Sequence, residues 1–149
     1  MTTRPYPFTK LPYGGDWNPE QWERPVWDED VQLFEHAGID LLSVNIFAWT
    51  ALQPAEDTYD FTRLDEVLAL LESRGMRACL GTGTAAIPAW MATAFPDVMR
   101  VDEQGRPHRF GGRHNACPNS PTYRLFAPAL AGHLARRYEG RDVVALWHV

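Results

Sequence analysis

The stretch LLSVNIF at residues 41–47 is mostly apolar and partly β-branched. It has the length of a strand that a parallel sheet buries on both faces. A helix is predicted before it over residues 27–37, where apolar side chains recur every three or four positions, at Trp27, Val31, Phe34 and Ala37. Gly38 is a natural stop for that helix. The pattern indicates a helix that leads into a buried strand.

The same alternation continues on both sides of this segment. Residues 11–16 predict a short strand that stops at the paired Gly14 and Gly15. After LLSVNIF, a loop is predicted through Pro54, and a second helical pattern over residues 61–71 follows. Gly75 ends that helix before the apolar run MRACL at residues 76–80, which predicts another strand.

A long loop region follows MRACL and contains a short helical segment at residues 88–94. A longer helix is predicted over residues 123–138, with Pro128 expected to kink it or to delay its start. An apolar strand at 143–149 comes last. Four strands separated by helices, with right-handed crossovers, predict a parallel α/β sheet or barrel. Because the apolar ALWHV has no closing helix after it, we expect a piece of a longer domain.

Composition limits the classes of function. The 149 residues are 45% apolar and 22% charged, with a net charge of -5, which is typical of a globular protein. No basic stripe exists that could neutralise nucleic acid or an anionic membrane. No apolar run spans a bilayer and no signal peptide is visible, so we expect a cytoplasmic protein. Cys79 and Cys117 do not suggest a disulfide framework.

The loop after the first predicted strand, GGDWNPEQW, places polar and aromatic side chains together. Loops that follow the strands collect the active site in barrels. Aromatic faces pack on the C–H faces of a sugar while amides and carboxylates bind its hydroxyls, so Asp16 and Asn18 are candidate sugar ligands. The alternative is a turn with a helix-capping Asn18 and tryptophans that pack the rim. Trp49, after the second strand, is a third candidate.

The segment FGGRHNACPNSP at residues 110–121 presents Arg113 between two glycines and a histidine. Its guanidinium keeps its charge and offers forked donors, so it could hold a carboxylate ionised or bind sugar oxygens. A structural salt bridge is the alternative role. Cys117 could be a metal ligand, but structural zinc needs about four ligands and no CxxC partner exists here. His148 lies on an apolar predicted strand, so it is predicted to be a hydrogen-bonded core histidine.

These motifs together resemble glycoside hydrolase family 42, the β-galactosidases. The resemblance rests on five ordered segments: YGGDWNPEQW at 13–22, LLSVNIFAWTALQPAEDTYDFTRLD at 41–65, TGTAAIPAWMATAFPDVM at 82–99, GGRHNACPNSP at 111–121 and ALWHV at 145–149. The departures are Trp17 for a more usual Tyr, Gln53 for a usual Glu, and Asp57-Thr58 where a glycine often stands. They fall in loops, so they bear on sugar preference more than on fold.

The resemblance implies that residues 1–149 are the N-terminal portion of a catalytic TIM (β/α)8 barrel with about four of its parallel strands. It implies a retaining β-galactosidase that releases terminal β-D-galactose and needs no cofactor for catalysis. The acid/base Glu and the nucleophile Glu would both lie beyond Val149. Arg113 becomes a substrate-binding residue. Cys117 matches the first cysteine of a four-cysteine structural zinc site, and the full-length protein is expected to be a homotrimer.

Two other functions compete with this interpretation. One is a related barrel glycosidase that acts on another sugar, such as an arabinopyranoside or a β-linked glucan. The other is a non-catalytic module for sugar binding or assembly. We expect the 149 residues alone to be inactive as a hydrolase, because both catalytic carboxylates are absent. Unpaired strand edges would favour aggregation or association with a partner.

Overall fold

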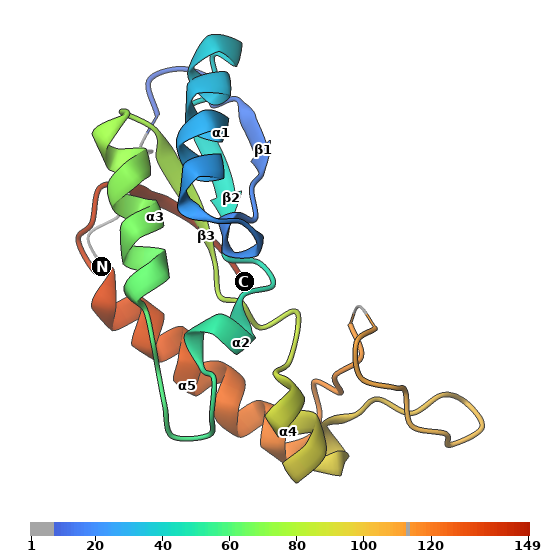
Figure 1. Ribbon diagram of the computed structural model, residues 1–149. Helices are drawn as coiled ribbons and strands as arrows, with labels where there is room; N and C mark the ends of the chain where they lie inside the picture. The colour runs from blue at the N-terminus through green and yellow to red at the C-terminus, as the bar shows by residue number, and fades with distance from the viewer. Residues whose placement is uncertain (1–7, 113) are drawn as a thin grey trace.

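Four parallel strands form one sheet in the computed structural model, which describes residues 8–112 and 114–149 (Figure 1). The strands are β1 (Gly14–Asp16), β2 (Leu41–Val44), β3 (Arg77–Gly81) and β4 (Val144–His148). Their order in the sheet is their order in the chain, β1-β2-β3-β4. All four strands predicted from the sequence are present, and each neighbouring pair is parallel.

One long helix connects each pair of neighbouring strands. These helices are α1 (Arg24–Ala37), α3 (Thr62–Ser73) and α5 (Pro121–Arg137). Four shorter elements lie in the loops: η1 (Pro19–Gln21), α2 (Trp49–Leu52), α4 (Ala89–Ala94) and η2 (Pro96–Val98). The three long helices and the short helix α4 confirm the sequence predictions. The predicted loop through Pro54 is wrong in part, because α2 occupies its centre.

Two predicted boundaries are also wrong. Gly14 and Gly15 do not end the first strand; both lie inside β1, and Gly14 pairs with Leu41. Pro128 does not delay α5, because the helix begins at Pro121 and continues through Pro128. The early start has a local cause: the Ser120 hydroxyl caps the helix by accepting the Tyr123 N–H at 3.2 Å.

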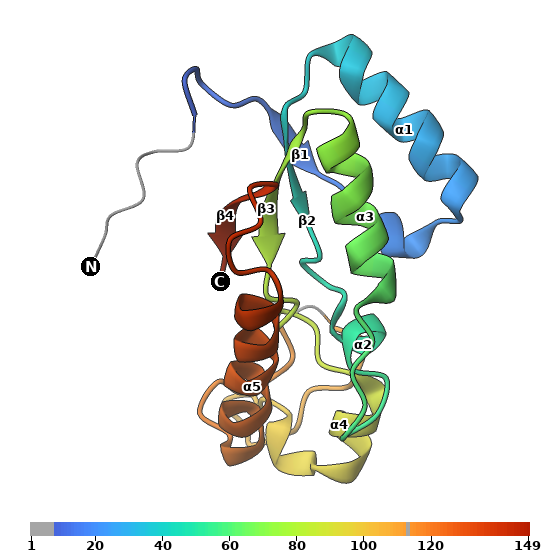
Figure 2. The ribbon, with the colours of Figure 1, turned by 90° about the vertical axis from the view of Figure 1, so that its left-hand side faces the viewer.

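The core lies between the sheet and the helices. Alternate residues of the two central strands point to this side and are at most 1% exposed: Leu42, Val44, Ala78 and Leu80. They belong to one apolar cluster with Trp27 and Val31 of α1, Leu68 and Leu71 of α3, and Leu130 and Leu134 of α5. Figures 1 and 2 show α1 and α3 side by side on this face.

The opposite face of the sheet is only partly covered by the described residues. Ser43 and Cys79 are half-buried there, whereas their neighbours in the strands are fully buried. On β4, Leu146, which pairs with Cys79, is 38% exposed. The run LLSVNIF predicts a strand that is buried on both faces. Within the described residues, only one face of the sheet is fully buried. The three long helices cover only that face of the sheet.

Polar bonds at the surface join the helices to one another. Arg74, which follows α3, pairs with Glu35 of α1 at 3.2 Å. Asp65 of α3 receives hydrogen bonds from Arg137 of α5 and from the Tyr138 hydroxyl. Burial alone would raise the pKa of Asp65, but these two donors outweigh it and lower that pKa. The contacts fix how α1, α3 and α5 lie over the sheet.

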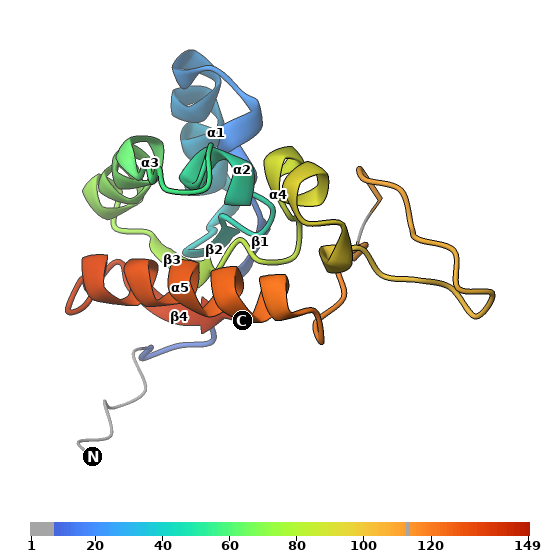
Figure 3. The same ribbon diagram turned by 90° about the horizontal axis from the view of Figure 1, so that it is seen from below.

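A long arm, residues 99–112 with its return segment 114–117, extends away from the body between α4 and α5 (Figures 1 and 3). Antiparallel bridges join Met99 to Ala116 at its base and Val101 to Pro107 further out. Asp102 binds Arg106 through a 2.8 Å ion pair within the arm. The loop region predicted after β3 therefore has a defined shape at its base.

The two glycines of β1 should respond very differently to substitution. A Cβ on Gly14 would stand 1.6 Å from the Leu41 carbonyl oxygen, whereas a Cβ on Gly15 would meet nothing within 4 Å. Gly14→Ala should therefore separate β1 from β2 and lower the free energy of unfolding by about 3 kcal/mol or more, and Gly15→Ala by less than about 1 kcal/mol. Urea unfolding of both variants measures this. Equal losses would contradict the β1–β2 pairing.

Candidate active site

The first strand places Asp16 at the carboxyl end of the sheet. Asp16 is exposed and lies beside Ser43 in the β1–β2 register, which in turn lies beside Cys79 of β3. Burial raises the pKa of the Cys79 thiol, a hydrogen bond with Ser43 opposes this effect, and the nearby Asp16 carboxylate adds to it. Asp16, Ser43 and Cys79 thus form a polar row on the face opposite the helices, which fits the prediction that Asp16 lies at the rim.

The two tryptophans of the first loop have different positions. Trp17 is 5% exposed, and its indole N–H donates to Asp30 of α1 at 2.9 Å. It packs edge-on against Trp27 and Phe34. Trp22, in contrast, is 55% exposed. Trp17 therefore anchors the loop on α1, as the rim-packing alternative predicts, and only Trp22 presents a face to solvent.

Asn18 and Glu20 lie at the start of η1 and within it, in the same loop. Asn18 Oδ1 and Glu20 Oε1 are buried and have no hydrogen-bond partner among the described residues. Burial raises the pKa of Glu20, although its own backbone N–H and the Arg63 charge oppose this. Asn18 stands at the N-cap position of η1, but its side chain makes no capping bond, so the alternative of a helix-capping Asn18 side chain is not supported.

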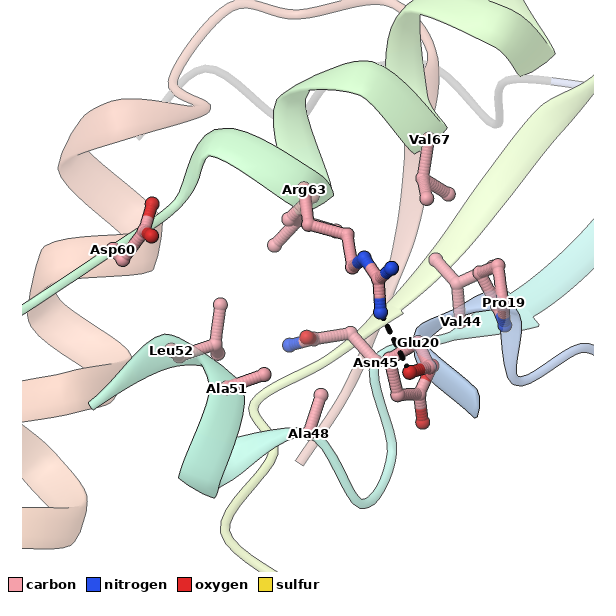
Figure 4. Close-up of a pocket in the computed structure, with 11 residues that line it drawn as sticks. Pro19, Glu20, Val44, Asn45, Ala48, Ala51, Leu52, Asp60, Arg63 and Val67 are labelled. Carbon is pink, nitrogen blue, oxygen red and sulfur yellow. Dashed lines mark hydrogen bonds between the residues drawn. The ribbon is translucent and has the colours of Figure 1, made fainter. Parts of the chain in front are cut away.

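A small cavity of about 50 Å³ lies beside Glu20 (Figure 4). Its walls come from η1, the end of β2, α2 and α3, and Arg63 in the wall donates to the Glu20 backbone carbonyl at 2.8 Å. Val44 and Val67, which line it, belong to the helix-facing core. A space of this size suits water rather than a sugar ring. It is therefore a feature of the core and not of the rim.

Asn45, immediately after β2, adopts a left-handed backbone conformation with φ of 68°. It is 4% exposed, and its side-chain amide donates to the Gly81 carbonyl at the end of β3 at 2.8 Å. Asparagine tolerates this conformation better than most residues. Asn45 thus ties the carboxyl ends of β2 and β3 together. The sequence pattern does not reveal this role, because Asn45 stands within the otherwise apolar run LLSVNIF.

Trp49 is fully buried in α2 and does not reach the surface. Its indole N–H donates to Gln53 Oε1 at 2.8 Å, and Gln53 donates in turn to the Glu56 carbonyl. The Trp90 indole donates to the Gln53 carbonyl at 2.9 Å. Because its indole N–H is bonded within the chain, Trp49 packs beneath the loops at the strand ends. Gln53, which stands where the family usually has Glu, is also completely buried, so this difference affects internal packing.

A pocket of about 240 Å³ lies at the carboxyl ends of β2, β3 and β4, and we call it the rim pocket. It is lined by Ile46, the 81–85 segment, His114, Tyr123, His148 and Val149. The Tyr123 hydroxyl donates to the Thr84 carbonyl at 3.1 Å, and the Tyr123 ring packs edge-on against Trp49. Thr82 and Thr84 share a hydrogen bond between their hydroxyls at 2.9 Å. Hydroxyls, imidazoles and an aromatic ring therefore gather where barrel loops bind ligands.

The prediction that His148 is a core histidine is wrong for this chain. His148 ends β4, is exposed and lines the rim pocket beside His114. The apolar residues on both sides of it in the sequence concealed this position. The glycines of GTGT are explained as predicted by close packing, because a Cβ on Gly81 would lie 3.0 Å from the Ile46 backbone.

Arg113, the strongest sequence candidate, lies outside the described residues. Cys117 is half-buried and held by its backbone, with its N–H bonded to the Val98 carbonyl at 2.8 Å. Among residues 8–112 and 114–149, no group of three or more His, Cys, Asp or Glu side chains could hold a metal ion. Cys117 alone does not make a zinc site. In the same ranges, no helix is long and apolar enough to cross a membrane.

The family model described as β-galactosidase, that of glycoside hydrolase family 42, matches residues 16–149. The chain belongs to this family. The chain is 53% identical to β-galactosidase BgaA of Planococcus sp. (strain 'SOS Orange') over 141 residues, which is 94% of this chain and 21% of that protein. It is 45% identical to β-galactosidase LacZ of Heyndrickxia coagulans, again over 94% of this chain and 21% of the relative.

Solved structures of β-galactosidases agree with the fold. A β-galactosidase from Bacillus circulans sp. alkalophilus superposes with a TM-score of 0.93 at 52% identity, covering 95% of this chain and 21% of that one. A β-galactosidase from Rahnella sp. R3 gives 0.91 at 40% identity, covering 97% and 22%. The chain thus spans about a fifth of the length of these relatives. Its four strands with their helices are the N-terminal part of the family's (β/α)8 barrel, as the sequence predicts.

Asn45 offers a sharp test of how the rim is held. Asn45→Ala removes the bond to Gly81 and leaves a β-carbon in a left-handed backbone, whereas Asn45→Gly removes the same bond but relieves the backbone. The Ala variant should therefore be less stable than wild type by about 2–3 kcal/mol, and less stable than the Gly variant by about 1 kcal/mol. Urea unfolding measures both. An Ala variant as stable as the Gly variant would show that the backbone at residue 45 is not left-handed.

Proposed function

We propose that the full-length protein to which these residues belong is a retaining β-galactosidase that releases terminal β-D-galactose. The observation that carries the proposal is membership of family 42, with matched relatives that are β-galactosidases. The rim pocket supports it, because it combines hydroxyl and imidazole groups with an aromatic ring. A terminal galactosyl unit is the substrate class, and neither nucleic acid nor a membrane is part of the proposal.

The reaction is a double displacement at the anomeric carbon. One Glu protonates the glycosidic oxygen as the bond to the leaving group breaks, while the second Glu attacks the anomeric carbon and forms a glycosyl-enzyme. The first Glu then takes a proton from water, which attacks the same carbon and releases galactose with retained configuration. The two carboxyls stand about 5–5.5 Å apart in such enzymes. Both would come from parts of the protein beyond residue 149.

The residues of this chain bind and position the sugar in this proposal. Arg113 donates to sugar oxygens and holds the nucleophile ionised, because its guanidinium stays charged and offers several donors. Asp16, exposed at the end of β1, accepts hydrogen bonds from hydroxyls. Asn18, whose Oδ1 is buried, would act indirectly by positioning the first loop. Trp49 acts indirectly, by supporting Tyr123 in the wall of the rim pocket.

Three further features belong to the proposal for the full-length protein. A structural zinc site would combine Cys117 with three cysteines from outside these residues, and catalysis itself would need no cofactor. The full-length protein would assemble as a homotrimer, and it would be cytoplasmic. Each follows from the family resemblance or the sequence rather than from the arrangement of the described side chains.

The experiment compares the full-length protein with the 149-residue chain on an aryl β-galactoside. The full-length protein should turn the substrate over, and the 149-residue chain should not, because it lacks both carboxylates. Arg113→Ala in the full-length protein should lower kcat/KM by about 100-fold through loss of charged hydrogen bonds. Arg109→Ala, four residues earlier in the arm, is the matched control and should retain activity.

Other outcomes have clear meanings. Turnover by the 149-residue chain would refute the assignment of both carboxylates to later residues. A full-length protein that prefers an aryl arabinopyranoside or a β-glucan would belong to the related glycosidases, and one that binds galactose without hydrolysis would be a binding module.

A further inference from the structure

One carboxylate, that of Asp97 in η2, ties the outgoing end of the arm to the start of α5. The Ser120 hydroxyl donates to Asp97 Oδ2 at 2.5 Å, and the Thr122 hydroxyl donates to Asp97 Oδ1 at 2.8 Å. The Thr122 N–H is a third, longer donor at 3.4 Å. Figure 3 shows η2 and the start of α5 side by side where the arm leaves the body. Both carboxylate oxygens therefore bind residues that stand 23 and 25 positions later in the chain.

Ser120 carries this contact on to Tyr123. The Ser120 hydroxyl donates its single proton to Asp97 and accepts the Tyr123 N–H at 3.2 Å. Because that proton is held by the carboxylate, the oxygen lone pairs of the hydroxyl are left to face the first N–H groups of α5. Ser120 is 4% exposed, so few water molecules can replace either partner. The carboxylate, the hydroxyl and the helix N–H thus form one chain of hydrogen bonds.

Tyr123 is the residue through which this chain of hydrogen bonds reaches the rim pocket, which it lines. Its ring packs edge-on against the buried Trp49, with ring centroids 6.0 Å apart, and its hydroxyl donates to the Thr84 carbonyl at 3.1 Å. These contacts hold the side chain at its far end. The backbone of Tyr123 is held by Ser120 and, through it, by Asp97. The position of this wall therefore depends on both ends.

The return segment of the arm is held at the same place. The Cys117 N–H donates to the carbonyl of Val98, the residue after the carboxylate, at 2.8 Å. The Ser120 N–H donates in turn to the Cys117 carbonyl at 3.0 Å. The segment from His114 to Tyr123 thus has its middle fixed against η2, and the residues at its two ends both line the rim pocket.

The charge of Asp97 suits this role. Hydrogen bonds from Ser120 and then from Thr122 hold the pKa of the Asp97 carboxyl below its usual range, so it is ionised at neutral pH. A negative charge beside the first turn of α5 is also favoured by the helix dipole. An ionised carboxylate accepts one hydroxyl on each oxygen. An amide has only one acceptor oxygen and would turn its NH2 group toward one of the two hydroxyls.

We propose that Asp97 is a positioning residue of the active site, which fixes Tyr123 in the wall of the rim pocket by holding Ser120 and Thr122 at the start of α5. This inference rests on the proposed function, in which the rim pocket helps to bind the galactosyl unit. Asp97 does not line the rim pocket itself. It therefore acts through Tyr123 and not by contact with the sugar.

The test compares Asp97→Asn with Asp102→Asn in the full-length enzyme. Asp102 is the matched control, because its carboxylate also accepts hydrogen bonds within the arm, from Arg106, but it lies outside the lining of the rim pocket. Asp97→Asn should raise the inhibition constant of galactose and the KM of an aryl β-galactoside about tenfold, the loss expected for one charged hydrogen bond. The value of kcat should change about threefold or less, because the carboxylates that perform the chemistry are untouched. Asp102→Asn should leave all three values within about twofold of wild type.

Two further variants test the route through Tyr123. Ser120→Ala keeps the carboxylate and removes the link, so it should reproduce the rise in the galactose inhibition constant even if Asp97→Asn does not fold. Tyr123→Ala removes the wall itself, so adding Asp97→Asn to it should raise that constant by less than about twofold more.

A role of Asp97 in stability alone would lower the urea midpoint of Asp97→Asn and leave the galactose inhibition constant unchanged. That result would overturn the inference, as would an unchanged constant in Ser120→Ala or fully additive effects of Asp97→Asn and Tyr123→Ala. In each of these cases the wild-type enzyme still hydrolyses the aryl β-galactoside. A wild-type enzyme that neither hydrolyses it nor binds galactose would instead refute the proposed function, and the inference would fall with it.

Discussion

Burial of alternate residues of β2 and β3 against the helices is the constraint on which the rest of the structure depends. Leu42, Val44, Ala78 and Leu80 are each at most 1% exposed, and all three long helices contribute side chains to the same cluster. Burial of four such side chains stabilises the fold by several kcal/mol, at about 25 cal/mol per Å² of apolar surface. Because side chains alternate along a strand, this packing also directs Ser43 and Cys79 to the opposite face.

The same packing aligns the carboxyl ends of the strands, and the site depends on that alignment. Asn45 joins the ends of β2 and β3, and Tyr123 joins the start of α5 to the loop after β3. Gln53 holds Trp49 and Trp90 beneath them. Rigid elements thus support loops that carry the polar groups, which is how a barrel separates stability from ligand binding. The rim pocket lies on these loops.

The sequence predicted the strands and long helices well because hydrophobic periodicity reports the core directly. Two predicted boundaries were wrong because a local contact outweighed the sequence pattern. Gly14 allows β1 to approach Leu41 closely and does not form a turn. The Ser120 cap starts α5 before the predicted residue. For the site, Asp16 lies at the rim as predicted. Trp49 is buried instead, and His148 is exposed, because periodicity does not show which side of a loop or strand end faces solvent.

Native-state hydrogen exchange of the amide groups tests the central claim most directly, because it ranks segments by the free energy of opening. The slowest exchange is expected in residues 41–44 and 77–81, the two strands buried beneath α1 and α3, and fast exchange is expected in residues 102–110 of the arm. Exchange in β2 and β3 as fast as in the arm would contradict the account, since the rim would then have no rigid support.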